Sequence, residues 1–94
     1  MKVALVTGGA TGIGAATVRE LANQGVFVAF QYSSSTKDAA ELESELLKKN
    51  LKVKSFQADL FKPESAKNLV SNVEKEFGSI DILINNAGLM TDSS

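Results

Sequence analysis

The chain has 94 residues, of which 44% are hydrophobic and 22% are charged, a composition typical of one small globular domain. Its 10 basic and 11 acidic residues give a net charge of -1, so we expect no nucleic-acid partner and no attraction to an anionic membrane surface. Neither cysteine nor histidine occurs, which excludes disulfides, thiolate nucleophiles and the usual zinc sites, and we expect no metal site.

The chain begins with a short apolar run. Residues 2–7 read Lys-Val-Ala-Leu-Val-Thr, and a continuous run of this length predicts a strand that is buried on both faces of a sheet. The segment has neither the basic region and cleavage site of a signal peptide nor about 18 consecutive apolar residues. We therefore expect a cytoplasmic protein without membrane contact.

Alternating helical and strand patterns follow this first strand. Residues 13–24 carry apolar residues at helical spacing, and residues 26–31 have the pattern of a second buried strand. A second helix is predicted to end at Asn50. Its apolar face is formed by Ala39, Leu42 and Leu46.

A third strand, a third helix and a fourth strand complete the pattern. Residues 53–58 predict a strand, and Pro63 is placed to begin a helix that ends at Gly78. Residues 80–84 predict the fourth strand. The third helix has the clearest amphipathic stripe, formed by Ala66, Leu69, Val70, Val73 and Phe77.

The resulting order, β-α-β-α-β-α-β, predicts an α/β fold with parallel strands joined by right-handed crossovers. We expect a Rossmann-type doubly wound parallel sheet, of which only the first half is present, with strand order 3-2-1-4. Residues 1–90 are expected to form this single domain, truncated after the fourth strand, and residues 91–94 a polar tail.

A glycine-rich motif lies between the first strand and the first helix, at residues 7–14, which read Thr-Gly-Gly-Ala-Thr-Gly-Ile-Gly. Gly8 permits a sharp turn out of the strand, Gly12 leaves space for a phosphate beside the backbone, and Gly14 allows close helix packing. In a Rossmann unit, a dinucleotide pyrophosphate meets the helix amides at this place. The alternative is a glycine-rich turn that binds no ligand.

Two further motifs stand in register with the glycine motif. Asp59 and Leu60 follow the third strand, and residues 85–88, Asn-Asn-Ala-Gly, follow the fourth. Together the three motifs resemble the short-chain dehydrogenase/reductase family, and are similar to its 3-oxoacyl-(acyl-carrier-protein) reductases and sugar dehydrogenases. The resemblance covers essentially the whole chain. It implies the NAD(P)-binding portion of an oxidoreductase that, at full length, transfers hydride between NADP(H) and a carbonyl or alcohol substrate.

The resemblance also implies a role for each motif. The loop of residues 8–14 holds the pyrophosphate and the adjacent riboses, Asp59 binds the adenine amino group, Leu60 adds a backbone contact, and the backbone of residues 86–88 lies along the cofactor. Asn86 either contacts the cofactor directly or only bonds neighbouring loops, and Asp59 is alternatively a turn or helix-cap residue. The candidate cofactor-binding residues are Gly8, Ala10, Thr11, Gly12, Ile13, Gly14, Tyr32, Ser33, Ser34, Asp59, Leu60, Asn86, Ala87 and Gly88.

The end of the second strand indicates which nicotinamide cofactor is preferred. NAD sites usually place an acidic residue there to bind the ribose hydroxyls, but no carboxylate follows that strand before Asp38. The hydroxyls of residues 33–36, the amides of the second helix and Lys37 would instead suit a 2′-phosphate. We therefore expect NADP in preference to NAD, although Thr11 stands where similar NADP-preferring proteins often carry arginine. The same hydroxyls alternatively only cap the second helix.

The catalytic residues implied by the resemblance are not found in this chain. They are a serine and a tyrosine followed four residues later by lysine, whereas Tyr32 is the only tyrosine here and Thr36 stands at that distance. We therefore assign no catalytic residue and expect the isolated chain to be inactive. The favoured hypothesis is the N-terminal part of a carbonyl reductase or alcohol dehydrogenase. The alternative is a stand-alone dinucleotide-binding or interaction module, and the substrate stays open.

The fourth strand is predicted to form an edge of this half-sheet, although it is internal in a complete doubly wound sheet. Exposed apolar side chains and unpaired amides would line it, guarded only by the charge of Asp81. We therefore expect marginal stability and self-association through this strand, or a need for a complementary C-terminal segment. The apolar residues concerned are Ile80, Ile82, Leu83 and Ile84.

Overall fold

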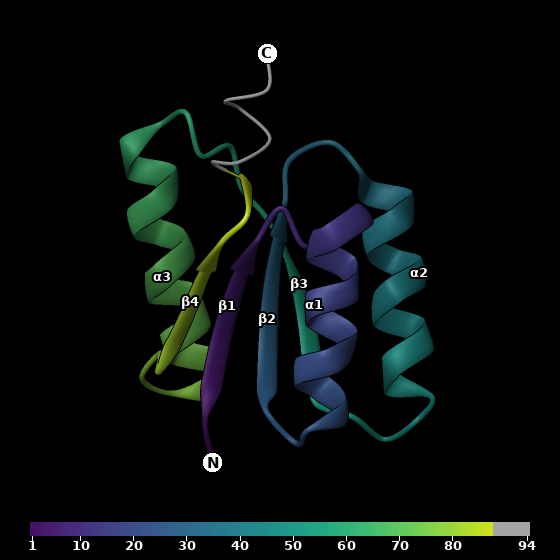
Figure 1. Cartoon of the computed structure of the whole chain (residues 1–94). Coiled ribbons are helices and arrows are strands. Elements are labelled where there is room, and N and C mark those ends of the chain that lie inside the picture. Colours follow the sequence, from purple (N-terminus) through teal and green to yellow (C-terminus); the bar gives the residue numbers. More distant parts are fainter. Residues whose placement is uncertain (88–94) are drawn as a thin grey trace.

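Short apolar strands alternate with amphipathic helices along the chain, and the computed structural model, which describes residues 1–87, folds them into one parallel sheet covered on both faces (Figure 1). The predicted α/β fold class, element order and strand order 3-2-1-4 are confirmed. Within these residues no helix has the length and apolar character needed to cross a membrane. In chain order the elements are β1 (Val3–Thr7), α1 (Gly12–Asn23), β2 (Phe27–Tyr32), α2 (Thr36–Leu47), β3 (Val53–Gln57), α3 (Pro63–Phe77) and β4 (Ile82–Asn85).

The second helix ends earlier than the sequence predicts. α2 is helical to Leu47, and Asn50, just beyond it, adopts a left-handed conformation with φ of 62°. In this turn the amides of Lys49 and Leu51 both donate to the carbonyl of Leu46 at 3.1 Å, so a carbonyl near the end of the helix finds its partners outside it. Asn50 therefore ends the helix from outside it, because asparagine tolerates the left-handed region better than most residues.

All paired strands run parallel, so their carboxyl ends lie at one edge of the sheet, at the top of Figure 1. In the order β3-β2-β1-β4, Val6 of β1 pairs with Phe30 of β2 on one side and with Ile84 of β4 on the other. This register brings the segments that follow all four strands to the same edge. The cofactor-binding residues predicted within residues 1–87 lie in these segments, at the end of β2 or at the start of α1.

The core has one layer on each face of the sheet. α1 and α2 cover one face, and α3 covers the other (Figure 1). The predicted apolar face of α2 is buried throughout, and full burial of a leucine side chain such as Leu42 or Leu46 contributes roughly 1.5–3 kcal/mol. The larger side chains of the first layer are Val6, Val18, Val28, Phe30, Leu42, Leu46 and Val53. The second layer is built from Val3, Leu5, Ala29, Ala58, Leu69 and Val73.

The third helix covers its face of the sheet only in part. Leu69 and Val73 are buried as predicted, but Val70, assigned to the same stripe, is 41% exposed, so that part of the prediction is wrong. Leu83 of β4 pairs with Leu5, which lies in the layer beneath α3, yet Leu83 is 63% exposed. The apolar surface of β4 therefore extends beyond the part of the sheet that α3 covers.

Asp81 binds β1 and does not guard the outer edge of β4 as the sequence predicts. Its carboxylate accepts a hydrogen bond from the amide of Val3 at 2.9 Å, and its own amide donates to the Val3 carbonyl at 2.8 Å. These two bonds extend the pairing of β4 with β1 and direct the carboxylate toward the inner strand. Within the described part of the chain β4 pairs only with β1, so its other side is an open edge.

Candidate functional site

A sharp turn carries the chain from β1 into α1 and forms the middle of the carboxyl edge. Gly8 has φ of 63°, a region that favours glycine, and a Cβ there would lie 3.2 Å from the amide nitrogen of Ala87. Gly8 therefore provides both the turn and a close approach of the segment after β4. This is the role that the sequence predicts for Gly8.

The first turn of α1 lies directly on this glycine turn. A Cβ at Gly14 would lie 2.0 Å from the carbonyl oxygen of Gly8 and 2.8 Å from Nδ2 of Asn86. No side chain fits there, so the position requires glycine. The sequence predicts that Gly14 brings α1 close to the sheet, and the structure identifies the contact as the Gly8 peptide.

Gly9 is a second packing position, which sequence reasoning missed. A Cβ at Gly9 would lie 2.6 Å from Cβ of Phe30 and 3.1 Å from Cγ2 of Val18. Glycine therefore allows the loop to lie between α1 and β2. The only signal in the sequence is the pair of adjacent glycines, and the nearer partner in space, Phe30, lies in a different strand.

The amino end of α1 is open to solvent and to an anion. The carbonyl of Thr11 accepts the amide of Ala15 at 3.1 Å, whereas its side chain makes no capping bond, and the first turn has no acidic residue. No atom lies within 4 Å of a Cβ built on Gly12, and Ile13 is 75% exposed. The first amides of a helix lack partners within it and carry the positive end of its dipole. This end of α1 can therefore accept a phosphate group.

The buried polar side chains of residues 1–87 gather at this same edge. They are Thr7 at 6%, Gln31 at 3% and Asn86 at 6% exposure, and within this range no buried side-chain nitrogen or oxygen lacks a partner. Oε1 of Gln31 accepts the amide of Gly8 at 2.8 Å, while Nε2 donates to the carbonyl of Ala58 at 2.8 Å. Sequence reasoning missed Gln31, for which the only signal is an amide at the end of an apolar strand.

Asn85, the last residue of β4, and Asn86, which follows it, bond to the end of β1 and to the turn after it. Nδ2 of Asn86 donates to the carbonyl of Gly8 at 3.1 Å, and the Thr7 hydroxyl donates to Oδ1 of Asn85 at 3.1 Å. The Thr7 hydroxyl also accepts the amide of Ala87 at 3.1 Å. These bonds give Asn86 a role in holding neighbouring loops together, while direct contact with a cofactor stays a prediction. Gly88 lies outside the described residues.

The segment after β3 places Asp59 at the same edge. Its Oδ1 accepts the amide of Phe61 at 3.1 Å, and its carbonyl accepts the amide of Lys62 at 3.1 Å, so Asp59 is a turn residue in this structure. The side chain is half-buried, and Leu60 packs against the core beneath α3. The contact between Asp59 and the adenine of the cofactor stays a prediction.

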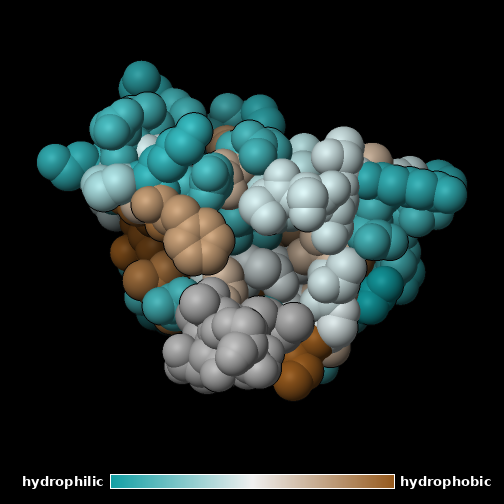
Figure 2. All heavy atoms as spheres, turned by 90° about the horizontal axis from the view of Figure 1, so that it is seen from above, coloured by the Kyte–Doolittle hydropathy of each residue, from teal (hydrophilic) through white to brown (hydrophobic). Residues whose placement is uncertain are grey.

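The end of β2 and the segment after it supply three more of the predicted residues. Tyr32 is half-buried against the α1 and α2 layer, while Ser33 and Ser34 are exposed. Ser35 stands at the N-cap of α2, but its side chain makes no capping bond. The hydroxyl of Ser35 therefore does not cap α2. Figure 2 looks down on this edge and shows pale side chains of intermediate hydropathy on part of it, with hydrophilic side chains along the upper margin and hydrophobic ones at the left and lower right.

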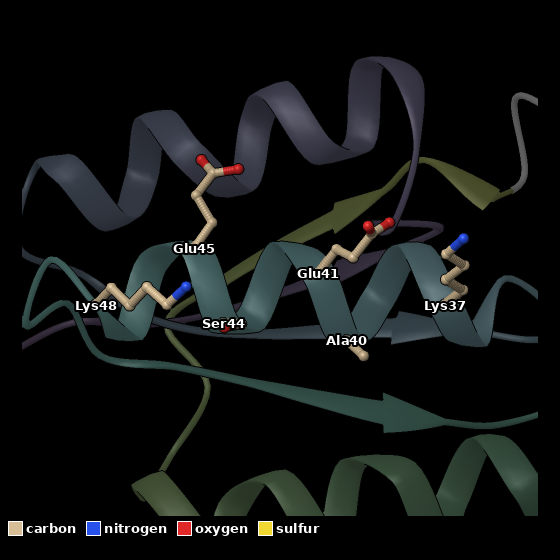
Figure 3. Close-up of a pocket in the computed structure, with 6 residues that line it drawn as sticks. All are labelled: Lys37, Ala40, Glu41, Ser44, Glu45 and Lys48. Atoms are coloured by element: carbon tan, nitrogen blue, oxygen red, sulfur yellow. The ribbon is translucent and has the colours of Figure 1, made fainter.

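A shallow depression lies elsewhere, along the outer face of α2 (Figure 3), and is lined by Lys37, Ala40, Glu41, Ser44, Glu45 and Lys48. Of these residues only Lys37 was considered for cofactor binding. The depression is open, and its charges serve helix pairing at least in part, because Arg19 of α1 binds Glu45 through two hydrogen bonds of 2.9 and 3.1 Å. This depression does not have the enclosed, convergent polar groups of a small-molecule site.

The ion pair between α1 and α2 shifts the pKa of both of its members. The hydrogen bond from Arg19 lowers the pKa of Glu45, and the same bond raises the pKa of Arg19. Because the pKa of the carboxyl is lowered on folding, the pair stabilises the fold above the ordinary pKa of glutamate, and this contribution is lost as the pH falls through the lowered pKa. Both side chains are substantially exposed, so the contribution is small.

Among residues 1–87, no three acidic side chains gather to hold a metal ion.

Comparisons with known proteins agree with this geometry. A sequence model of the family described as short chain dehydrogenase matches residues 2–94. The chain is 37% identical over 92 residues to the 3-oxoacyl-(acyl-carrier-protein) reductase FabG of Staphylococcus epidermidis, covering 98% of this chain and 38% of that protein. It is 40% identical over 88 residues to the short-chain dehydrogenase/reductase homolog YusS of Bacillus subtilis, covering 94% of this chain and 81% of that protein.

Solved structures share the fold. A blue fluorescent protein from a metagenomic library, in complex with NADPH, superposes with a TM-score of 0.86 and 41% identity, covering 90% of this chain and 35% of that chain. The chain belongs to the short-chain dehydrogenase family. It spans 38% of the length of the FabG relative.

The close approach of Gly14 to the Gly8 carbonyl can be tested by substitution. Replacing glycine with alanine inside a helix normally stabilises the helix by about 1 kcal/mol. Gly14→Ala should instead destabilise the chain by about 2 kcal/mol or more, because the methyl group would push α1 away from the Gly8 carbonyl. Urea unfolding followed by circular dichroism measures this change.

Gly12→Ala is the matched control for this experiment. Gly12 also has positive φ, 55°, but open space surrounds it, so the substitution should cost only about 1–2 kcal/mol of backbone strain. A stabilised Gly14→Ala variant would show that α1 does not rest on the Gly8 peptide.

Proposed function

We propose that this chain binds a nicotinamide dinucleotide at the carboxyl edge of its sheet, with NADP(H) preferred. One observation carries the proposal: the uncapped amino end of α1 is held against the Gly8 turn, with open space at Gly12. A pyrophosphate needs amide donors and room to approach the backbone, and this loop offers both. The NADPH bound to the similar solved structure supports the same assignment.

The residues around the edge have distinct roles in this proposal. The loop of residues 8–14 holds the pyrophosphate, with the amides of Gly12 and Ile13 as donors. Asp59 and the backbone of Leu60 contact the adenine, and the segment that begins at Asn86 lies along the cofactor. The other proposed contacts are Ala10, Thr11, Tyr32, Ser33, Ser34, Ala87 and Gly88.

The preference for NADP(H) follows from the end of β2. An acidic side chain there would bind the ribose hydroxyls of NAD and repel a 2′-phosphate, but this segment offers the exposed hydroxyls of Ser33 and Ser34. Lys37 stands in the first turn of α2 and is also exposed, so its charge is available to the phosphate. Asp38 in the same turn opposes this effect, which predicts a modest preference.

In a full-length oxidoreductase of this family, we propose that residues 1–90 form the NAD(P)-binding domain. The bound cofactor would supply the hydride, and this chain's residues would orient it at the strand ends. The carbonyl or alcohol substrate and the proton donor would contact residues beyond those that we assign here. A cytoplasmic location is part of the same proposal.

Replacement of Ile13 tests the pyrophosphate site. Ile13→Glu places a carboxylate in the first turn of α1, where it should repel a pyrophosphate and, through the helix dipole, preserve or raise thermal stability. NADPH affinity, measured by titration calorimetry, should fall by about tenfold or more, which corresponds to about 1.4 kcal/mol or more. Parent chain should bind NADPH more tightly than NADH.

Ala16→Glu is the control, because Ala16 is exposed on the same helix one turn farther from its amino end. It should retain more NADPH affinity than Ile13→Glu. The proposed function would be refuted if the parent chain bound neither dinucleotide at millimolar concentration, and the assigned preference would be refuted by tighter binding of NADH.

We further propose that the chain self-associates through the outer edge of β4. Leu83 is largely exposed on this short strand, and Asp81 directs its carboxylate to β1. An exposed apolar edge with unpaired backbone groups is a template for pairing with another strand. Two copies could pair their β4 edges symmetrically.

Sedimentation velocity at tens of micromolar tests this association. Leu83→Lys should shift the chain to monomer, because a charge on the strand opposes edge pairing. Leu47→Lys, at an exposed apolar position on α2, should leave the association unchanged. A strictly monomeric parent chain, with the amides of Ile82 and Ile84 as protected from hydrogen exchange as that of Leu5, would contradict the proposal.

A further inference from the structure

Gln31 is an unusual residue for its place in the fold. It lies in β2, between the buried Phe30 and the half-buried Tyr32, and the residue is only 3% exposed. Burying an amide is unfavourable unless both its donor and its acceptor find partners. Gln31 meets this requirement with partners in the segments that follow two different strands.

The two partners of the Gln31 side chain stand on opposite sides of β2. Oε1 accepts the amide of Gly8, in the turn after β1, and Nε2 donates to the carbonyl of Ala58, directly after β3. The backbone adds two bonds at the same level: the Gly9 amide donates to the Gln31 carbonyl at 3.0 Å, and the Ala58 amide donates to the Tyr32 carbonyl at 3.0 Å. The end of β2 is thus joined to both neighbouring loops.

On the β1 side, the Gln31 side chain binds the chain of β1 just beyond the last strand pair. The parallel pairing of β1 with β2 extends to Val6 and Phe30, after which the chain of β1 turns away at Gly8. The Gly8 amide then faces a side-chain oxygen instead of a strand carbonyl. Only asparagine and glutamine provide a neutral donor and a fixed acceptor on one amide, and glutamine has the longer reach.

The two loops that Gln31 joins belong to different parts of the proposed cofactor site, and the inference rests on that proposed function. Gly8 begins the loop assigned to the pyrophosphate, and Ala58 immediately precedes Asp59, which is assigned to the adenine. A dinucleotide gains affinity from both parts only if their separation matches the ligand before binding. We propose that Gln31 is a positioning residue that sets this separation.

Binding of the whole ligand and of its parts separates positioning from local support. Gln31→Met removes both hydrogen bonds with little change in volume. Gln31→Asn keeps the amide but is one methylene shorter, so it cannot reach Gly8 and Ala58 together, and it serves if the methionine variant does not fold. The probes are NADPH, adenosine 2′-monophosphate for the adenine end and inorganic pyrophosphate for the glycine loop. Amide chemical-shift titration of the 94-residue chain gives each affinity.

A positioning role predicts unequal losses. NADPH affinity should fall by about tenfold or more in either variant, because the two parts no longer bind one ligand together, while each fragment stays within about twofold of the parent value. Gln24→Met, which removes an exposed glutamine at the far end of α1, should change none of the three affinities.

Other results would overturn the inference in different ways. Equal losses for NADPH and both fragments would mean that Gln31 only supports the local fold. Unchanged NADPH affinity would mean that the separation does not depend on it. If the parent chain binds NADPH and the variants give either of these two results, only this inference is refuted. If the parent chain binds none of the probes, the proposed function is refuted as well.

Discussion

The arrangement of the carboxyl edge depends on the peptide group of Gly8. Its amide donates to Gln31, its carbonyl accepts from Asn86, and the same carbonyl lies where a Cβ on Gly14 would have to be. Strand β2, helix α1 and the segment after β4 therefore meet at one glycine. Because both hydrogen-bonding groups are fixed, the direction in which the chain leaves β1 is fixed as well, and so is the position of the amino end of α1.

The sheet explains why polar groups are buried only here among the described residues. Along the strands, parallel pairing satisfies the backbone, and apolar side chains fill both layers of the core. Beyond the strand ends the chains diverge and the backbone groups need other partners. Thr7, Gln31 and Asn86 provide them. This support leaves the first amides of α1 free of side-chain caps, which is the feature that an anionic ligand requires.

Much of the fold could be predicted because its signals are local. Strand runs, helical spacing and the glycines at the element ends specified the β-α-β alternation, and the alternation limited the topology. Two side chains have environments that differ from the prediction, because distant partners determine those environments. Val70 follows the helical spacing of its neighbours, but α3 contacts the sheet through Leu69 and Val73. Asp81 has a charge in the sequence, and only the pairing with Val3 determines where that charge points.

The residues of the candidate site also fall into two groups, those that a local pattern predicts and those whose role depends on distant partners. The glycine motif and its place after β1 could be predicted from spacing, whereas Gly9 and Gln31 owe their roles to Phe30 and Ala58, which are distant in sequence. No local pattern distinguishes a glycine that avoids a clash from one that only turns the chain. Similarly, a glutamine at a strand end is informative only when the loops on both sides are known.

A dinucleotide that binds as proposed meets the amino end of α1 on the Gly8 turn. Residue-by-residue amide chemical shifts of the chain, recorded as NADPH is added, test this contact most directly. The largest changes should occur at Gly12 and Ile13, with smaller changes at Asp59 and little change on the outer face of α2. Changes confined to Ser44 and Lys48 on that face, with none in the glycine loop, would contradict the proposed contact.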